Sequence, residues 1–310
     1  MDETEVLRGR VILITGASGF TGRHACEYFS ELGMQVAAIV RDMDQVAKVD
    51  AIQYYSCDLL DQPRISGLIN RIAPDYILHL GGKNSVFESW HKPIVYIQSN
   101  LMPTLYLLDA MRAKPDCIML VVGSRVSADL TILDKATHPY GLSKSLQKAV
   151  ALSWRKLFDQ KVILAEPSNL IGPGVSTGFC TLLGRYIVES ELGRHPSPFR
   201  ISSRADRRDF LDVRDAVRAY GYLLVSGSFG EVYPVCSGTE RSLEEITDKM
   251  LEVADRSVPL IWGDNRSSEG SSPSERATLV ESLGWYPKIP LAKSLGDVIE
   301  YLRTMEGEIR

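Results

Sequence analysis

The sequence has few cysteines and no long apolar run, and both features exclude classes of protein. Its 310 residues include only five cysteines, dispersed and without a C-x-x-C pair, which is typical of reduced thiols in the cytosol. No run reaches the roughly 20 apolar residues that a membrane helix requires. The chain begins with the acidic segment MDETEV, whereas a secretion signal is basic and then apolar. We therefore expect a cytoplasmic protein that does not contact a membrane.

An excess of basic charge is also missing. The chain has 35 lysines and arginines against 39 acidic residues, for a formal net charge of −4, and it lacks a basic tract. This balance argues against binding to nucleic acid. The histidines have no metal-ligand spacing, so we expect no metal site, with His79 in a strand and His91, His138 and His195 on the surface.

The first 170 residues alternate between two hydrophobic patterns. Short runs that are apolar on both faces, as in a parallel sheet covered by helices, occur at residues 10–16, 35–41, 52–58, 76–81, 117–124 and 161–167. Segments of helical length lie between them, at residues 22–32, 61–72, 93–112 and 141–158. This alternation predicts an α/β fold with a doubly wound parallel sheet, the Rossmann arrangement, over residues 1–170.

The alternation stops after Asn169, and residues 171–310 indicate a smaller α/β lobe. Segment 172–208 is rich in Gly, Pro, Ser and Arg, and 264–275 reads as a surface loop. The remaining predicted elements are helices near 181–192, 242–255 and 291–305 and a strand at 231–238. Ser242 and Glu245 match a capping box at the start of the second of these helices. We expect this lobe to bind substrate, with segments near 209–230 returning to the first domain.

A glycine-rich loop follows the first predicted strand. Gly16, Gly19 and Gly22 are spaced G-x-x-G-x-x-G, which lets the backbone turn sharply and approach a pyrophosphate. The helix that follows supplies amide donors and a positive dipole end. We therefore predict that this loop, with Ser18, Phe20 and Thr21, binds a dinucleotide.

The end of the second strand bears on which dinucleotide binds. Val40 stands where NAD enzymes typically place a carboxylate, and Arg41 follows it. Because a guanidinium suits a 2′-phosphate, NADP(H) is favoured over NAD(H). Asp42 leaves two interpretations open, a ribose contact or an exposed side chain. Asp58, after the third strand, either contacts the adenine or caps the next helix.

Tyr140 and Lys144 are four residues apart, so on a helix they share one face. A nearby ammonium would lower the pKa of the phenol, which could then give a proton to a carbonyl oxygen as a hydride arrives. Ser124, at the end of the fifth strand, could hydrogen-bond the same oxygen. We predict that Ser124, Tyr140 and Lys144 form the catalytic site.

Taken together, these motifs resemble a known family. TGASGFTG, Ser124, YGLSK, NLIGPG and RRDFLDVRD are similar to the extended short-chain dehydrogenase/reductases that act on nucleotide sugars. PDYILHL, GEVYPVCSG and LGWYPKIPLAKSL resemble in particular the GDP-4-keto-6-deoxy-D-mannose reductases. The matches cover nearly the whole chain.

The resemblance implies further site residues. On the cofactor side they are Leu59, Gly81, Lys83 and Pro167, together with Tyr140 and Lys144. On the nucleotide-sugar side they are Ser85, Val86, Asn169, Arg208, Arg266 and Glu269. Two arginines would neutralise the diphosphate. Arg208 also has a structural interpretation, an ion pair with Asp209 or Asp212.

Helix 93–112 carries an apolar stripe that we assign to the core, formed by Ile94, Ile97, Leu101, Leu105, Leu108 and Met111. The resemblance also implies a homodimer, in which this helix and the one carrying Lys144 form the seam. The sequence leaves open whether one or two faces of the helix are buried.

The residues near Ser124 separate the reactions of the family. No acidic residue follows Ser124, which disfavours dehydration, and no cysteine stands beside it, which disfavours 3,5-epimerisation. Reduction of a 4-keto-6-deoxyhexose with NADPH is favoured. Three sites depart from the family pattern. Glu166 replaces the usual Arg, Ser168 the usual Phe, and Gly81-Gly82 the usual Ala-Ala. The alternatives are a 4-epimerase, a 4,6-dehydratase or a non-catalytic nucleotide-binding protein.

Overall fold

The computed structural model describes residues 3–46, 48–127, 137–194, 197–255, 257–263 and 277–307. The chain divides into two compact units, each built from three stretches of sequence. The first holds Met1–Pro167, Val217–Tyr233 and Leu279–Trp285, and the second holds Ser168–Ala216, Pro234–Thr278 and Tyr286–Arg310. His195, Arg266, Glu269 and the predicted loop 264–275 lie outside the described residues.

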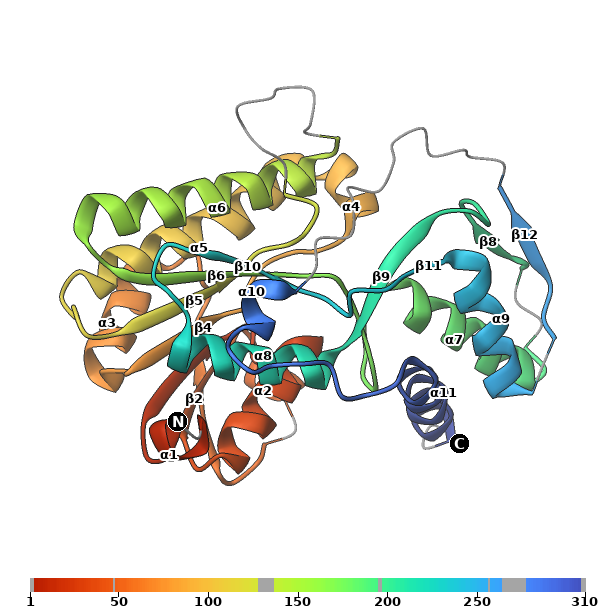
Figure 1. Ribbon diagram of the computed structural model, residues 1–310, viewed down its shortest axis with the longest axis horizontal. Coiled ribbons are helices and arrows are strands. Elements are labelled where there is room, and N and C mark those ends of the chain that lie inside the picture. Colours follow the sequence, from red (N-terminus) through yellow and green to blue (C-terminus); the bar gives the residue numbers. More distant parts are fainter. Residues whose placement is uncertain are drawn as a thin grey trace. The chain divides into compact units, whose positions relative to one another are not determined.

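The first unit is built on a seven-stranded sheet of order β10-β6-β5-β4-β1-β2-β3 (Figure 1). Its strands are β1 (Val11–Thr15), β2 (Gln35–Val40), β3 (Ile52–Ser56), β4 (Tyr76–His79), β5 (Ile118–Val122), β6 (Lys161–Pro167) and β10 (Val232–Val235). The pairings from β3 across to β6 are all parallel. The predicted doubly wound parallel sheet is confirmed.

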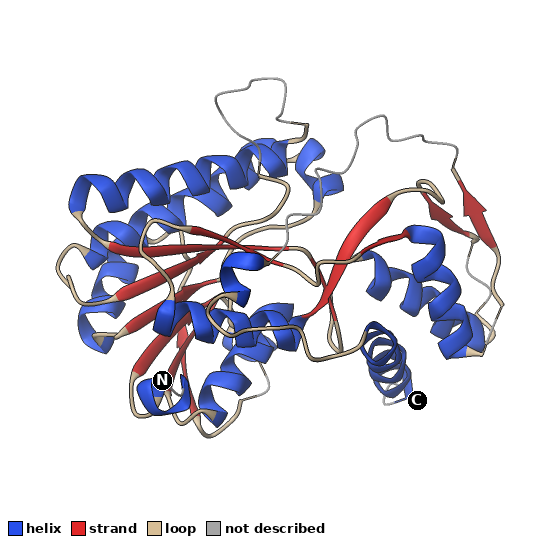
Figure 2. Ribbon diagram, in the orientation of Figure 1, coloured by secondary structure: helices blue, strands red, loops and turns tan. Residues whose placement is uncertain are grey.

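Helices cover both faces of this sheet, as Figure 2 shows. One face carries α3 (Gln62–Ile72), α5 (Pro93–Met111) and α6 (Pro139–Phe158), and Figure 1 shows α2 (Phe20–Glu31) and α8 (Val213–Ser226) on the other. Strand residues such as Leu13, Ile77 and Leu164 share one apolar core with Leu107 of α5 and Ala151 of α6. Short elements complete the unit: α1 (Glu3–Leu7), η1 (Met43–Gln45), α4 (Val86–His91) and α10 (Thr278–Glu281).

The apolar stripe predicted for α5 is only partly correct. Leu108 and Met111 are buried, but Ile94 is 67% exposed, and Ile97, Leu101 and Leu105 are half-buried. The buried face also includes Tyr96, Pro103 and Leu107 and the polar residues Asn100 and Thr104. Because the polar members hydrogen-bond internally, a pattern based on hydrophobicity alone found only part of the buried face.

The second unit is built from short strands and three helices. Strands β11 (Glu240–Ser242), β9 (Arg207–Asp212) and β7 (Asn169–Ile171) form one sheet, and β8 (Phe199–Ile201) pairs with β12 (Leu260–Trp262). Helices α7 (Phe179–Glu191), α9 (Leu243–Ala254) and α11 (Leu291–Gly307) share a core that includes Ile187, Phe210, Ile246 and Val298. Strands of three residues are too short to show a period of two, so the sequence did not reveal them.

Two further predictions for the C-terminal half can be compared with the structure. The strand predicted at 231–238 is β10, which pairs into the seven-stranded sheet. The capping box of α9 is confirmed, since Ser242 Oγ accepts from Glu245 N at 3.0 Å and Glu245 Oε2 accepts from Ser242 N at 2.9 Å.

Candidate active site

The glycine loop lies between β1 and α2, where the backbone approaches itself closely. Gly16 has a φ of +67°, and a Cβ there would lie 2.9 Å from Gly81 Cα. A Cβ on Gly22 would lie 2.1 Å from the Gly16 carbonyl oxygen. Only glycine fits at these positions, because any side chain would separate strand and helix.

The start of α2 fits the phosphates of a dinucleotide. Gly19 is its N-cap and makes no side-chain capping bond, so Phe20, Thr21 and Gly22 form a first turn whose N–H groups suit an anion. Arg23 Nε holds the loop by donating to the Ser18 carbonyl at 3.0 Å. The residues predicted for the phosphate loop are therefore brought together.

The carboxylates at the ends of β2 and β3 are both engaged locally. Asp42 Oδ1 caps η1 by accepting from Asp44 N at 3.0 Å, while Arg41 beside it is exposed. Asp58 Oδ1 accepts from Leu60 N at 3.0 Å, and Asp61, not Asp58, caps α3. The helix-cap interpretation of Asp58 is therefore wrong.

Leu59 packs directly against the next predicted cofactor residue, Gly81. A Cβ on Gly81 would lie 2.4 Å from Leu59 Cδ1 and 3.2 Å from Thr15 Oγ1. The alanine usual in the family therefore does not fit here without a shift of Leu59, which accounts for one departure noted in the sequence.

Helix α6 positions the catalytic candidates. It begins at Pro139, so Tyr140 and Lys144 lie in its first two turns. His138 caps it, with its Nδ1 accepting from Gly141 N at 2.8 Å, so this half-buried histidine is not the surface residue that the sequence suggested. Ser124, two residues beyond β5, hydrogen-bonds the Tyr140 side chain. The tyrosine ring stacks on His138 at 5.9 Å between centroids.

Burial raises the pKa of Tyr140, and the hydrogen bond with Ser124 offsets part of this effect. The direction is opposite to the lowered pKa expected from a neighbouring ammonium. The physical reason is desolvation, since a buried phenolate loses its hydration. The phenol is therefore held in its protonated form.

Lys144 is buried within the fold. Its Nζ donates to the Val122 carbonyl at 3.0 Å and to Gln147 Oε1 at 2.8 Å. Burial lowers the pKa of this lysine to about 8. Gln147 was not predicted, although its position three residues after Lys144 places both on one helical face.

A buried histidine lies in the same hydrogen-bonded system. His79 of β4 contacts Thr15 Oγ1 through Nδ1 at 2.7 Å and Thr104 Oγ1 through Nε2 at 2.9 Å. Burial, with the Lys144 charge, lowers the pKa of His79 to about 3. The imidazole is therefore neutral at physiological pH.

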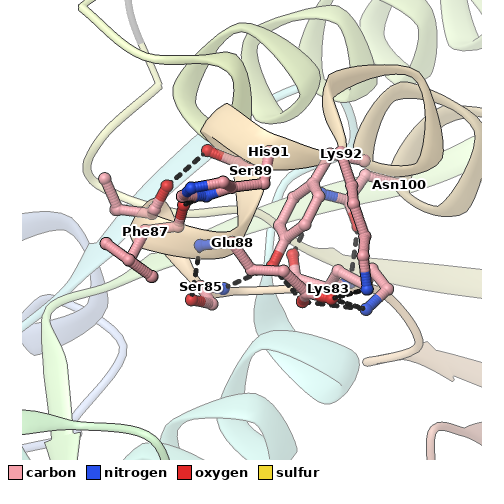
Figure 3. Close-up of polar contacts among 10 residues, drawn as sticks. Lys83, Ser85, Phe87, Glu88, Ser89, His91, Lys92 and Asn100 are labelled. Carbon is pink, nitrogen blue, oxygen red and sulfur yellow. Dashed lines mark hydrogen bonds and ion pairs between the residues drawn. The ribbon is translucent and has the colours of Figure 1, made fainter.

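A second polar cluster surrounds Glu88 of α4 (Figure 3). Its carboxylate accepts from Lys83 Nζ at 3.0 Å, Lys92 Nζ at 3.2 Å and the Tyr96 hydroxyl at 2.9 Å. These bonds lower the pKa of Glu88 to about 2. Ser85 caps α4 and donates its N–H to the Tyr96 hydroxyl at 3.1 Å.

Lys83 thus binds the carboxylate of Glu88, and Ser85 contacts the Glu88 N–H and the Tyr96 hydroxyl. The sequence did not single out Glu88. Val86, the first residue of α4, is 40% exposed. Asn100 ties the backbone of Lys83 to α5, since its amide accepts from Lys83 N at 2.7 Å and donates to Lys83 O at 3.0 Å.

Glu166 is the last residue but one of β6, immediately before Pro167. The buried carboxylate accepts from Ser127 Oγ at 2.9 Å and lies 3.1 Å from Lys148 Nζ. The acidic residue at this position is thus matched by a lysine on α6, one turn beyond Lys144.

The second unit carries the other predicted substrate residues that the structure describes. Asn169 of β7 is exposed, and its Nδ2 donates to the Asp209 carbonyl at 2.9 Å. Arg208 of β9 is also exposed and lies 3.8 Å from Asp206. Asp209 and Asp212 have other partners, Ser237 and Arg214, so the ion pairs suggested for Arg208 with them are absent from the described residues.

Comparison with known proteins decides the family. The model of the NAD dependent epimerase/dehydratase family matches residues 12–236, more than half of the chain. The chain belongs to this family. It is therefore an enzyme of the extended short-chain dehydrogenase/reductase type, whose members modify nucleotide sugars as reductases, epimerases and dehydratases. The resemblance drawn from the sequence motifs is confirmed.

Individual relatives span nearly the same length. The GDP-6-deoxy-D-mannose reductase of Pseudomonas aeruginosa is 27% identical over 303 residues, which cover 93% of this chain and 95% of the relative. The structure of RMD from the same organism, complexed with NADPH, matches with a TM-score of 0.79 and 26% identity over 96% of this chain and 98% of that chain. A UDP-glucose 4-epimerase of Mycoplasma genitalium is 27% identical over 67% of this chain and 68% of its own.

Two further observations concern membranes and metals. Within the described ranges, none of the helices combines the length and apolar character needed to span a bilayer. In that same part of the chain, His, Cys, Asp and Glu side chains form no group of three or more that could hold a metal ion.

Proposed function

We propose that this enzyme is an NADP(H)-dependent reductase of a nucleotide-linked 4-keto-6-deoxyhexose, with GDP-4-keto-6-deoxy-D-mannose as the substrate, in deoxysugar biosynthesis. The observation that carries the proposal is the hydrogen bond between the buried Tyr140 and the half-buried Ser124, with Lys144 one turn along the same helix. Similarity to a GDP-6-deoxy-D-mannose reductase along nearly the full chain supports this choice of substrate.

Tyr140 acts as the acid. Because burial raises the pKa of its phenol, it holds its proton until a carbonyl oxygen next to it gains negative charge. Ser124 donates to the same oxygen from a second direction and orients it. A bound NADPH supplies the hydride.

The choice of NADP(H) over NAD(H) is supported by the end of β2. Arg41 is exposed there, and Asp42, which could have bound a ribose hydroxyl, is engaged in capping η1. A guanidinium free to move can make paired charge-assisted bonds to a 2′-phosphate. Asp58, with its side chain at the adjoining strand end, is the proposed contact to the adenine.

The substrate diphosphate is proposed to bind Arg208 and Asn169, with Arg266 and Glu269 near the nucleotide. Arg208 is suited to this role because its ion pair with Asp206 is long at 3.8 Å and its guanidinium is exposed, so an anion can replace the carboxylate. A homodimer through α5 and α6 is supported by the half-buried Ile97, Leu101 and Leu105 on the outer side of α5.

The test is a turnover assay with purified enzyme, NADPH and GDP-4-keto-6-deoxy-D-mannose, followed by NADPH absorbance and product analysis. We expect NADPH to be consumed in proportion to a 6-deoxyhexose product. Conversion of a nucleotide sugar without net NADPH loss, by enzyme that retains bound NAD, would instead identify a 4-epimerase. Binding without turnover across GDP-, UDP-, dTDP- and CDP-linked sugars would contradict an enzymatic role.

A further inference from the structure

The ammonium group of Lys144 is held by a network of neutral groups. Among the described residues, its Nζ donates to the Val122 carbonyl at 3.0 Å and to the side-chain amide of Gln147 at 2.8 Å. Gln147 is 1% exposed, so no solvent competes for its amide. The direction of that amide therefore determines whether Lys144 has a second acceptor.

Only one orientation of the Gln147 amide satisfies both of its ends. Its Oε1 accepts from Lys144, while its Nε2 donates to Thr104 Oγ1 at 2.9 Å. The reverse orientation would place an NH₂ against the ammonium, and two donors facing each other in a buried site are strongly unfavourable. The Thr104 hydroxyl must act as an acceptor for this arrangement to hold.

The contacts of His79 and Thr15 fit Thr104 as an acceptor toward Gln147. Thr15 Oγ1 accepts from Gly81 N at 3.1 Å, and we assign its own hydrogen to the 2.7 Å contact with His79 Nδ1. The imidazole then carries its proton on Nε2 and donates it to Thr104. Thr104 directs its own hydrogen to the Asn100 carbonyl at 3.2 Å.

We propose that Gln147 is a positioning residue for Lys144, and that its amide is oriented by the chain of hydrogen bonds running from Gly81 through Thr15, His79 and Thr104. The chain begins at a glycine of the proposed cofactor site and ends at the lysine of the proposed catalytic site. The inference rests on the proposed function for its catalytic meaning, but the positioning itself does not depend on any reaction.

The consequence concerns the protonation of Lys144. A neutral amide stabilises the ammonium less than a carboxylate would. The pKa of the buried Lys144 therefore stays close to physiological pH. Two carboxylates on the packed elements are paired with lysines, Glu166 with Lys148 and Glu88 with Lys83 and Lys92. His79, Tyr96 and Tyr140 are uncharged.

The experiment measures the titration of Lys144 by ¹³C NMR of protein enriched at the lysine ε-carbon. The resonance is assigned by its loss in Lys144→Arg. The variants are Gln147→Leu, which removes the acceptor, and Gln147→Glu, which replaces it by an anion. Gln160→Leu is the matched control, because Gln160 is also buried and also donates its amide within the unit, to Leu108 O at 2.8 Å.

In Gln147→Leu, we expect the Lys144 pKa to fall by about one unit, and in Gln147→Glu to rise by at least about one unit. The alkaline limb of the turnover profile should move in the same directions, with kcat changing more than KM. Thr104→Val keeps Gln147 but removes the hydroxyl that accepts from its amide. It should also lower the Lys144 pKa, and it replaces Gln147→Leu as the test if that variant does not fold.

The proposal is overturned if Gln147→Glu and Thr104→Val leave the Lys144 titration where Gln160→Leu leaves it. Because the NMR measurement uses neither NADPH nor a sugar nucleotide, its result stands even if the proposed reductase activity is not found. Conversely, if the enzyme reduces the sugar but the Lys144 pKa does not respond to changes at Gln147, the proposed function stands and the positioning role of Gln147 is wrong.

Discussion

Tyr140 and Lys144 are both buried, and burial moves the pKa of each toward its uncharged form. Desolvation therefore dominates over the mutual effect of the two groups in the chain itself. For a ketone reduction this is productive, since the phenol must hold a proton before it can give one. The acid is available at neutral pH without any adjustment by the lysine.

Replacing Tyr140 by Phe should lower kcat by about 10²- to 10⁴-fold, because a positioned general acid is lost, while the affinity for NADPH stays nearly unchanged. Kinetics and fluorescence titration measure the two effects separately. Tyr220→Phe is the matched control, since Tyr220 is fully buried and its hydroxyl makes no hydrogen bond within the described residues. Equal kcat for both variants would remove Tyr140 from the mechanism.

The ion pair of Lys148 and Glu166 should contribute measurably to stability. Lys148→Met leaves a carboxylate that is only 7% exposed without its cation. Because the lysine itself is about one-third exposed, we expect a loss of about 2 kcal/mol, below the range for a fully buried pair. Urea denaturation measures it, and Lys148→Arg should restore most of the loss. A neutral result for Lys148→Met would mean that water replaces the lysine.

His79 should make the protein sensitive to acid. Its pKa in the folded chain is about 3, below the ordinary value of 6.5, so the unfolded chain binds the proton more readily. Stability is complete above pH 6.5 and should fall by up to about 4 kcal/mol as the pH drops toward 3. Melting temperatures of wild type and His79→Asn over this range test it, and parallel curves would contradict it.

Some of the individual residues of the candidate site could be predicted from sequence. Ser124, Tyr140 and Lys144 stand out because they occur in a fixed order after a glycine loop, and local spacing places two of them on one helical face. Gln147 and Glu88 could not be found in that way. Their roles depend on partners such as Thr104 and Tyr96, which only the folded chain brings near.

Among the secondary-structure elements, the junction of β1 and α2 depends on glycine for packing. In Gly22→Ala, the added Cβ would lie 2.1 Å from the Gly16 carbonyl, so strand and helix must separate. We expect a loss of about 2 kcal/mol and a weakened affinity for NADPH. Denaturation and ligand titration measure both.

Gly67→Ala, on α3, is the matched control for that variant. A Cβ there meets nothing within 4 Å, and alanine favours a helix interior by about 1 kcal/mol. The control should therefore be neutral or stabilising. If both alanines were tolerated equally, the close approach at Gly22 would not constrain the fold.

Most of the long elements could be predicted, but α8 and β9 were missed, and so were the three-residue strands. β6 and α5 extend over enough residues for a period to appear in the sequence. The three-residue strands β7, β8, β11 and β12 have none, and their pairing depends on distant segments. Only part of the buried face of α5 was found because Asn100 and Thr104, both completely buried, satisfy their polar atoms internally.

For the molecule as a whole, ligand binding should raise the melting temperature. NADPH at about 100 times its dissociation constant adds about 2.7 kcal/mol to the stability of the folded state, and NADH at the same concentration should add less. Arg41→Ala should abolish the difference between the two dinucleotides, because it weakens the binding of NADPH and not that of NADH. A thermal-shift comparison of both dinucleotides on both proteins measures this, and an Arg41→Ala variant that still prefers NADPH would place the 2′-phosphate elsewhere.

The interleaved assembly of the two units has a consequence for biosynthesis on the ribosome. β10, the strand that lies against β6 at the border of the large sheet, is translated only after β7, α7, β8, β9 and α8. Until then β6 is an edge strand of the nascent sheet, with one side of its backbone unpaired. Most of its interior residues are apolar, and all of them are buried in the finished enzyme. The nascent chain is therefore most prone to aggregate, and most in need of a chaperone, in the interval before β10 emerges.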